Sequence, residues 1–172
     1  MKAAKLVSLV AAAGLMASGS AMAATQGTVG ATSSGSSIVS ILIPDLIRIT
    51  NLADITFADY NGDGLDRTLG SPACVRTNGA TTYGIVATSA NGLYELNPSL
   101  GTTTTTIPYT VTWGGTNLAY NTNLAAQGVD STTLGACTAV ADKLQVTITG
   151  ANLDAAEADS YQDTVTLTVT PE

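Results

Sequence analysis

The segment running from Asp59 to Asp66, Asp-Tyr-Asn-Gly-Asp-Gly-Leu-Asp, comes nearest in this chain to a chemical motif. Asp59, Asn61 and Asp63 place oxygen-bearing side chains at relative positions one, three and five, and Gly64 follows at position six. This spacing matches the first half of a calcium loop. The glutamate expected at position twelve is replaced by Gly70. Two interpretations stay open, a calcium site that also uses Asp66, or two glycine turns that join strands.

Catalytic groups are scarce. The chain has no histidine, so the commonest general base and the commonest zinc ligand are both missing. Its serines lie in neither a Gly-x-Ser-x-Gly nor a Ser-x-x-Lys pattern, which would activate a nucleophile. Paired carboxylates remain near the C-terminus, at Asp154, Glu157, Asp159 and Asp163, but few aromatic residues are available to line a sugar cleft. We therefore expect no enzymatic activity and no cofactor.

The first 23 residues have the pattern of a cleavable export signal. Lys2 and Lys5 precede an apolar stretch, and the small residues Ala21-Met-Ala23 provide a cleavage site. The two cysteines, Cys74 and Cys137, belong to the exported part. Because exported proteins meet an oxidising environment, we expect a structural disulfide between them, with two buried free thiols as the alternative.

Charge and hydropathy exclude further classes of function. Beyond the signal, four basic residues stand against thirteen acidic ones: Arg48, Arg67, Arg76 and Lys143 are the basic ones. Such a balance repels phosphate backbones, so we expect no nucleic-acid partner. No run in the exported part approaches the roughly 20 apolar residues of a spanning helix, so we expect no membrane span.

The remaining chain alternates apolar and polar residues in short runs that are typical of β-strands. The clearest runs cover residues 107–113, 144–149 and 165–170, and weaker ones cover 46–49, 55–57, 74–77, 83–88 and 93–96. One or two helical turns are expected around 152–159, with an acidic loop as the alternative. This pattern predicts an all-β, immunoglobulin-like sandwich over residues 45–172. The polar, glycine-rich residues 24–36 are expected to form a flexible leader.

The segment 37–44, Ser-Ile-Val-Ser-Ile-Leu-Ile-Pro, is apolar on both faces of an extended strand. Its apolar residues are Ile38, Val39, Ile41, Leu42 and Ile43. Two interpretations stay open. The segment is either the first strand of its own sandwich or a donor strand that inserts into a neighbouring subunit, where the closing strand around 165–169 lines the acceptor groove.

The end of the chain, Asp159-Ser-Tyr-Gln-Asp-Thr-Val-Thr-Leu-Thr-Val-Thr170, resembles the closing strand of spore-coat-U-like pilins, the subunits of archaic chaperone-usher fimbriae. The export signal, the apolar N-terminal strand and the lone cysteine pair are similar features. The resemblance implies an incomplete sandwich that a donor strand from the next subunit completes. Tyr161, Val165, Leu167 and Val169 are then the acceptor-groove or core residues.

The same resemblance implies partners and a location. The subunit would polymerise with itself or with sister pilins, after passage through the periplasm with a periplasmic chaperone and an outer-membrane usher. The product would be a cell-surface fimbria that serves adhesion or biofilm formation. The alternative is a secreted, self-contained β-sandwich that binds a carbohydrate or acts as a calcium-dependent adhesion module.

Overall fold

A computed structural model describes residues 24–137 and 141–172, and the expected export signal at 1–23 lies outside these residues. The chain divides into two compact units, Met1–Ile43 and Pro44–Glu172. The second unit is almost entirely β-structure, which confirms the expected all-β class. No helix within the described ranges is long and apolar enough to cross a bilayer.

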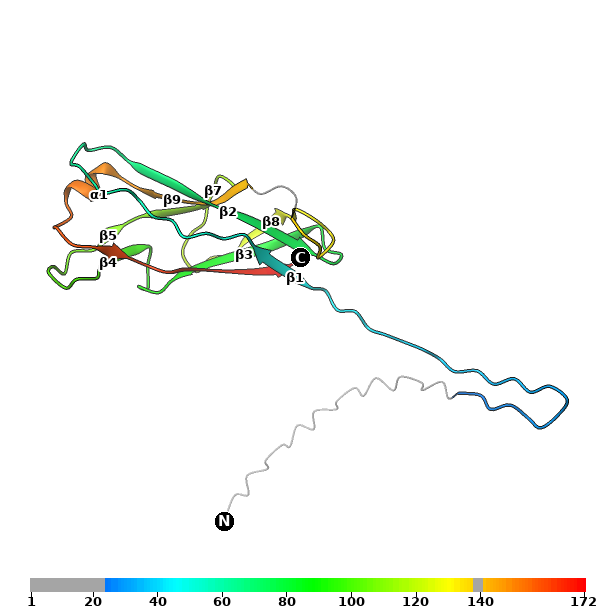
Figure 1. Cartoon of the computed structure of the whole chain (residues 1–172). Coiled ribbons are helices and arrows are strands. Elements are labelled where there is room, and N and C mark those ends of the chain that lie inside the picture. The colour runs from blue at the N-terminus through cyan, green and yellow to red at the C-terminus, as the bar shows by residue number, and fades with distance from the viewer. Residues whose placement is uncertain (1–23, 138–140) are drawn as a thin grey trace, which may run out of the picture. The chain divides into compact units, whose positions relative to one another are not determined.

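The described strands form antiparallel sheets that lie in layers (Figure 1). The largest sheet has the order β1 (Ile47–Thr50), β2 (Arg67–Thr77), β9 (Ala141–Ile148), β6 (Thr110–Trp113) and β7 (Thr116–Asn117). A second has the order β11 (Val165–Pro171), β3 (Thr82–Ser89) and β8 (Leu124–Gly128). A third has the order β10 (Tyr161–Gln162), β4 (Glu95–Pro98) and β5 (Ile107–Pro108).

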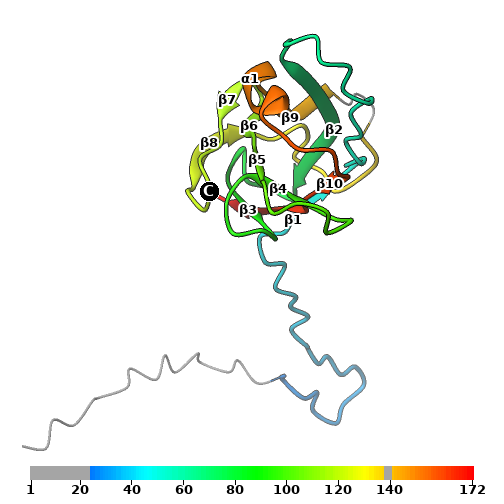
Figure 2. The same cartoon turned by 90° about the vertical axis from the view of Figure 1, so that its left-hand side faces the viewer.

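The core lies between the largest sheet and the sheet of β3, and Figure 2 views these layers from the end where α1 (Gly150–Asp154) lies. Alternate residues of β6 and β9 supply one side, including Val111, Trp113 and Val146. Tyr83 and Ile85 of β3 supply the other, and both are 0% exposed. Trp113 Nε1 donates to the Tyr83 hydroxyl at 2.8 Å, so one buried hydrogen bond joins the two layers.

The run 107–113 is divided between two sheets instead of forming one strand. Ile107 and Pro108 pair with β4, whereas Thr110–Trp113 pair with β9. Pro108 has no N–H for a ladder, and it sits in the edge strand β5, as its chemistry requires. Residues 55–57 form no strand, although Ile55 and Phe57 are half-buried against the core.

The helix begins two residues before the expected position. Thr149 caps it, because its side-chain oxygen accepts from Asn152 N at 3.3 Å, and the helix ends at Asp154. The expected disulfide is confirmed: Cys74, fully buried in β2, is bonded to Cys137, with 6.5 Å between the two Cα atoms. It attaches the loop before β9 to the outer part of the largest sheet.

Candidate functional site

Strand β11 ends its sheet, because it pairs with β3 on one side and with no strand of the described chain on the other. At its two ends, Ala90 N donates to Thr164 O and Glu172 N donates to Thr82 O, both at 3.0 Å. Antiparallel pairs alternate, so every second residue of β11 bonds to β3. The intervening residues Val165, Leu167 and Val169 therefore direct their backbone N–H and C=O groups to the open edge.

The same three residues direct their side chains towards the core. Val165, Leu167 and Val169 are half-buried and pack against the core cluster, whereas the threonines between them are exposed. The neighbouring strand β3 is more completely covered, since Ile85 and Ala87 are both 0% exposed. The open edge thus combines unpaired backbone groups with apolar side chains whose burial is incomplete.

Strand β1 forms a second open edge close to the first. Asn78 N donates to Leu46 O at 3.2 Å, so the even-numbered residues of β1 bond to β2. Ile47 and Ile49 therefore present their backbone groups to the other side, and their side chains are half-buried. Cα atoms of β1 and β11 approach within 8 Å, and both views place the two strands side by side (Figures 1 and 2).

The irregular segment after β1 continues along the largest sheet without becoming a strand. Ser71, which is fully buried in β2, accepts a hydrogen bond from Ala53 N and donates one to Ala53 O, both at 2.8 Å. A serine side chain thus replaces the ladder at this point. Pro72 has no N–H to donate to a strand that continues from β1, which accounts for the interruption. On the other side of β2, the register with β9 shifts between Ser71 and Pro72.

The closing motif fixes the start of β11 through side-chain hydrogen bonds. Tyr161 is half-buried against the core and donates from its hydroxyl to Glu157 O at 2.8 Å. Asp163 Oδ2 accepts from Ser89 Oγ and from the Tyr109 hydroxyl, both at 2.5 Å. Burial, together with the hydrogen bond to Asp163, raises the pKa of Tyr109 above its ordinary value.

Asp163 is both one of the paired carboxylates near the C-terminus and part of the closing-strand motif. The structure gives it a structural position, since it joins β11 to β3 and to the chain between β5 and β6. The sequence pattern could have indicated this role. Asp163 alternates with Tyr161 and Val165, so its side chain lies on the same face as theirs and is half-buried, as they are.

The four carboxylates near the C-terminus do not converge on one site. Asp154 accepts from Tyr60, and Asp159 holds the loop 99–102 by accepting from Leu100 N at 2.9 Å and from Thr102 N at 3.0 Å. These hydrogen bonds, with that of the Thr102 hydroxyl first among them, lower the pKa of Asp159 to about 2. Asp154, Asp159 and Asp163 thus each accept hydrogen bonds from different residues, and these bonds hold different parts of the fold.

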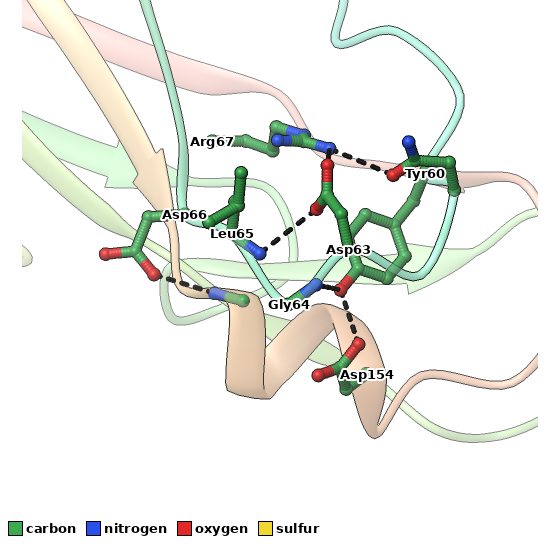
Figure 3. A network of polar contacts seen from close by, with 9 residues as sticks. Tyr60, Asp63, Gly64, Leu65, Asp66, Arg67 and Asp154 are labelled. Carbon is green, nitrogen blue, oxygen red and sulfur yellow. Dashed lines mark hydrogen bonds and ion pairs between the residues drawn. The ribbon is translucent and has the colours of Figure 1, made fainter.

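The calcium-like segment is held together by protein groups (Figure 3). Asp63 forms an ion pair with Arg67 at 2.6 Å and accepts from Leu65 N at 3.0 Å, and these contacts lower the pKa of its carboxyl. Asp66 turns to α1, where it accepts from Gly150 N at 2.8 Å. Within the described ranges, no group of three or more acidic, histidine or cysteine side chains has the arrangement of a metal site. This geometry favours the turn interpretation.

The segment 37–44 belongs to the N-terminal unit, apart from its last residue, and has no ladder partner in the described chain. Its apolar side chains are exposed: Ile38 by 59%, Val39 by 94%, Ile41 by 85%, Leu42 by 89% and Ile43 by 66%. Within the leader, Thr25 and Ser36 form an antiparallel bridge with reciprocal backbone hydrogen bonds of 3.0 Å.

In comparisons with known proteins, no family model matches the chain and no curated protein sequence matches it. The function is therefore inferred from the open edge, the exposed segment and the residues that surround them.

Proposed function

We propose that this chain is a structural subunit of a surface fimbria, in which residues 37–44 of one subunit pair with the open edge of β11 in the next. The observation that carries the proposal is this edge. Val165, Leu167 and Val169 combine outward backbone groups with half-buried apolar side chains. An added strand would satisfy both the backbone and the side chains.

The exposed N-terminal segment has the chemistry of such a strand. Val39, Ile41 and Ile43 share one face of an extended chain, and each is at least 66% exposed. Apolar strands that are left open invite edge-to-edge aggregation, which proteins usually prevent with charges or bulges. The segment carries no charge between Ser37 and Pro44, so its chemistry suits docking better than permanent exposure.

The location and the partners of the proposed subunit follow from the resemblance of its closing strand to spore-coat-U-like pilins. The domain is then an incomplete immunoglobulin-like sandwich, and the inserted strand adds to the open edge of β11. Export to the periplasm, capping by a periplasmic chaperone and transfer to an outer-membrane usher would precede polymerisation. The resulting fimbria serves adhesion or biofilm formation.

The test is to place a charge in the middle of the proposed donor strand. Ile41→Asp puts a carboxylate among apolar side chains, where burial of an unpaired charge is costly. Export should continue and polymers should be lost. The control Thr28→Asp adds the same charge within the leader, outside the strand, and should polymerise normally. Filaments are measured by negative-stain microscopy, and polymers by unboiled gel electrophoresis in detergent.

The gel separates the proposal from its alternatives. A strand-exchanged polymer gives a detergent-resistant ladder that collapses to monomer on boiling. A self-contained secreted sandwich gives a single band with or without boiling, and a calcium-dependent module loses stability when a chelator is added. Normal filaments from the Ile41→Asp variant would show that the donor-strand assignment is wrong.

A further inference from the structure

Two arginines in this acidic protein lack an acidic partner. Arg67 is paired with Asp63 at 2.6 Å, and Lys143 is paired with Asp130 at 2.7 Å. Arg48 and Arg76 form no ion pair within residues 24–137 and 141–172. They face each other across β1 and β2 in the antiparallel register, so two unneutralised positive charges share one face of the sheet.

Arg76 is unusual because it is buried. Only 4% of the residue is exposed, yet its guanidinium contacts neutral acceptors alone: Nη1 donates to Leu134 O at 3.4 Å and Nη2 donates to Thr50 Oγ1 at 3.3 Å. Both hydrogen bonds are long for a charged donor. Among the residues that the structure describes, the buried Nε–H has no acceptor. A buried charge with an unsatisfied donor is costly unless something else neutralises it.

The two arginines line a common hollow. Thr50 and Asn51 at the end of β1, together with the loop Leu134–Cys137, complete its walls, and its volume is about 560 Å³. The disulfide from Cys137 to Cys74 holds that loop against β2, and Arg76 lies two residues from Cys74 on the same face of the strand. The hollow is therefore a built feature of the sheet surface, with a buried positive charge in its wall and an exposed one, Arg48, beside it.

We propose that this hollow binds an oxyanion: a phosphate, sulfate or carboxylate group. The exposed Arg48 guanidinium at the rim can donate two parallel hydrogen bonds to such a group, and the Arg76 guanidinium, buried in the wall of the hollow, supplies a second positive charge. Because the rest of the surface is acidic, the site selects a single anionic group and disfavours polyanions such as nucleic acids. Arg48 and Arg76 alternate with core-facing residues such as Ile49 and Val75, so their side chains lie on the face of the sheet that is turned away from the core. The site is therefore separate from the proposed docking edge of β11 and does not depend on the fimbrial proposal.

Calorimetric titration of the purified mature protein with inorganic phosphate, sulfate and galacturonate tests the site. At least one anion should bind saturably with one site per chain, and the preferred anion identifies whether inorganic or sugar-acid groups are the source. Arg48→Gln should weaken binding at least tenfold. The control Arg67→Gln removes an equal charge from a side chain that Asp63 already neutralises, and binding should stay within twofold of the unmodified protein.

A second measurement needs no substitution. The Nε–H resonance of Arg76 in a ¹⁵N-correlated NMR spectrum should move and saturate with the same anion, while that of Arg67 should stay in place. Absence of saturable binding by all three anions, an unmoved Arg76 resonance, or an equal loss in the Arg67→Gln control would each overturn the proposal.

Discussion

Two neighbouring tyrosines, Tyr94 and Tyr109, should respond differently to removal of their hydroxyl groups. The rings of Tyr94 and Tyr109 lie 5.5 Å apart between centroids. The Tyr109 hydroxyl donates to Asp163 at 2.5 Å, whereas the buried Tyr94 hydroxyl has no hydrogen-bond partner in the described part of the chain. Both Tyr→Phe variants therefore keep the aromatic packing, but only Tyr109→Phe loses a hydrogen bond.

The magnitudes follow from these contacts. A hydrogen bond to a charged acceptor contributes about 1.5–3 kcal/mol, so Tyr109→Phe should lower the free energy of unfolding by about 2 kcal/mol. Asp163 keeps Ser89 Oγ as a donor, which prevents a larger loss. Tyr94→Phe removes an unsatisfied buried hydroxyl and should be neutral or stabilising by up to about 1 kcal/mol.

The assay is urea unfolding followed by the fluorescence of Trp113, the single tryptophan of the chain. Since Trp113 is 1% exposed and hydrogen-bonded to Tyr83 in the core, its emission reports loss of packing between the two layers. Equal losses of stability in the Tyr109→Phe and Tyr94→Phe variants would refute the reasoning, because they would show that the aromatic packing, and not the bond to Asp163, determines the effect.

Alkaline pH provides an independent readout of the same bond. The pKa of Tyr109 is raised in the folded protein by burial and by the bond to Asp163, so the folded state holds this proton more tightly than the unfolded state. Its contribution to stability is complete below the unfolded pKa of about 10 and is lost as the pH rises above that value. The difference in stability between the unmodified protein and Tyr109→Phe should therefore shrink above pH 10.

Three further perturbations test the fold around the site. Replacement of both Cys74 and Cys137 by alanine should lower stability by roughly 2–5 kcal/mol, measured by denaturant unfolding, and an unchanged midpoint would show that the bridge is not structural. Gly150→Ala would place a Cβ 2.0 Å from Gly64 O and should cost about 1–3 kcal/mol, whereas Gly79→Ala, with no atom within 4 Å, should be nearly neutral. Because the pKa of Asp159 is lowered to about 2, its stabilisation is present above pH 4 and is lost as the pH falls towards 2. The melting temperatures of the unmodified protein and Asp159→Asn should therefore converge over that range, and a constant difference would contradict this role of Asp159.

The strands that could be predicted from sequence are those in which apolar residues alternate with polar ones, such as β9 and β11. Strand β8 was missed because Leu124-Ala-Ala-Gln-Gly128 has no β-branched residue, and its pairing with β3 is irregular. Residues 55–57 have the right pattern, but the Ser71 side chain replaces a backbone ladder nearby. In both cases contacts with distant residues override the local preference.

The candidate sites divide in the same way. The apolar row of β11 is visible in the sequence, because a period of two is a local property. The hollow of Arg48 and Arg76 is not, because it depends on the register between β1 and β2 and on a disulfide that brings in a loop from residues 134–137. The calcium-like segment shows the converse: its spacing is local, but its partners Arg67 and Gly150 come from the following strand and from α1.

The pairing of β11 with β3 also sets the register that the proposed donor strand requires. Val165, Leu167 and Val169 direct both their side chains inward and their backbone groups to the open edge. In an antiparallel or parallel addition, donor residues whose side chains point inward must therefore recur at every second position. Val39, Ile41 and Ile43 meet this requirement without interruption, whereas a slip by one residue would bring Ser40 to the core face. The central serine on the opposite face thus disfavours a slip by one residue, which gives a segment that is apolar on both faces one preferred inward face.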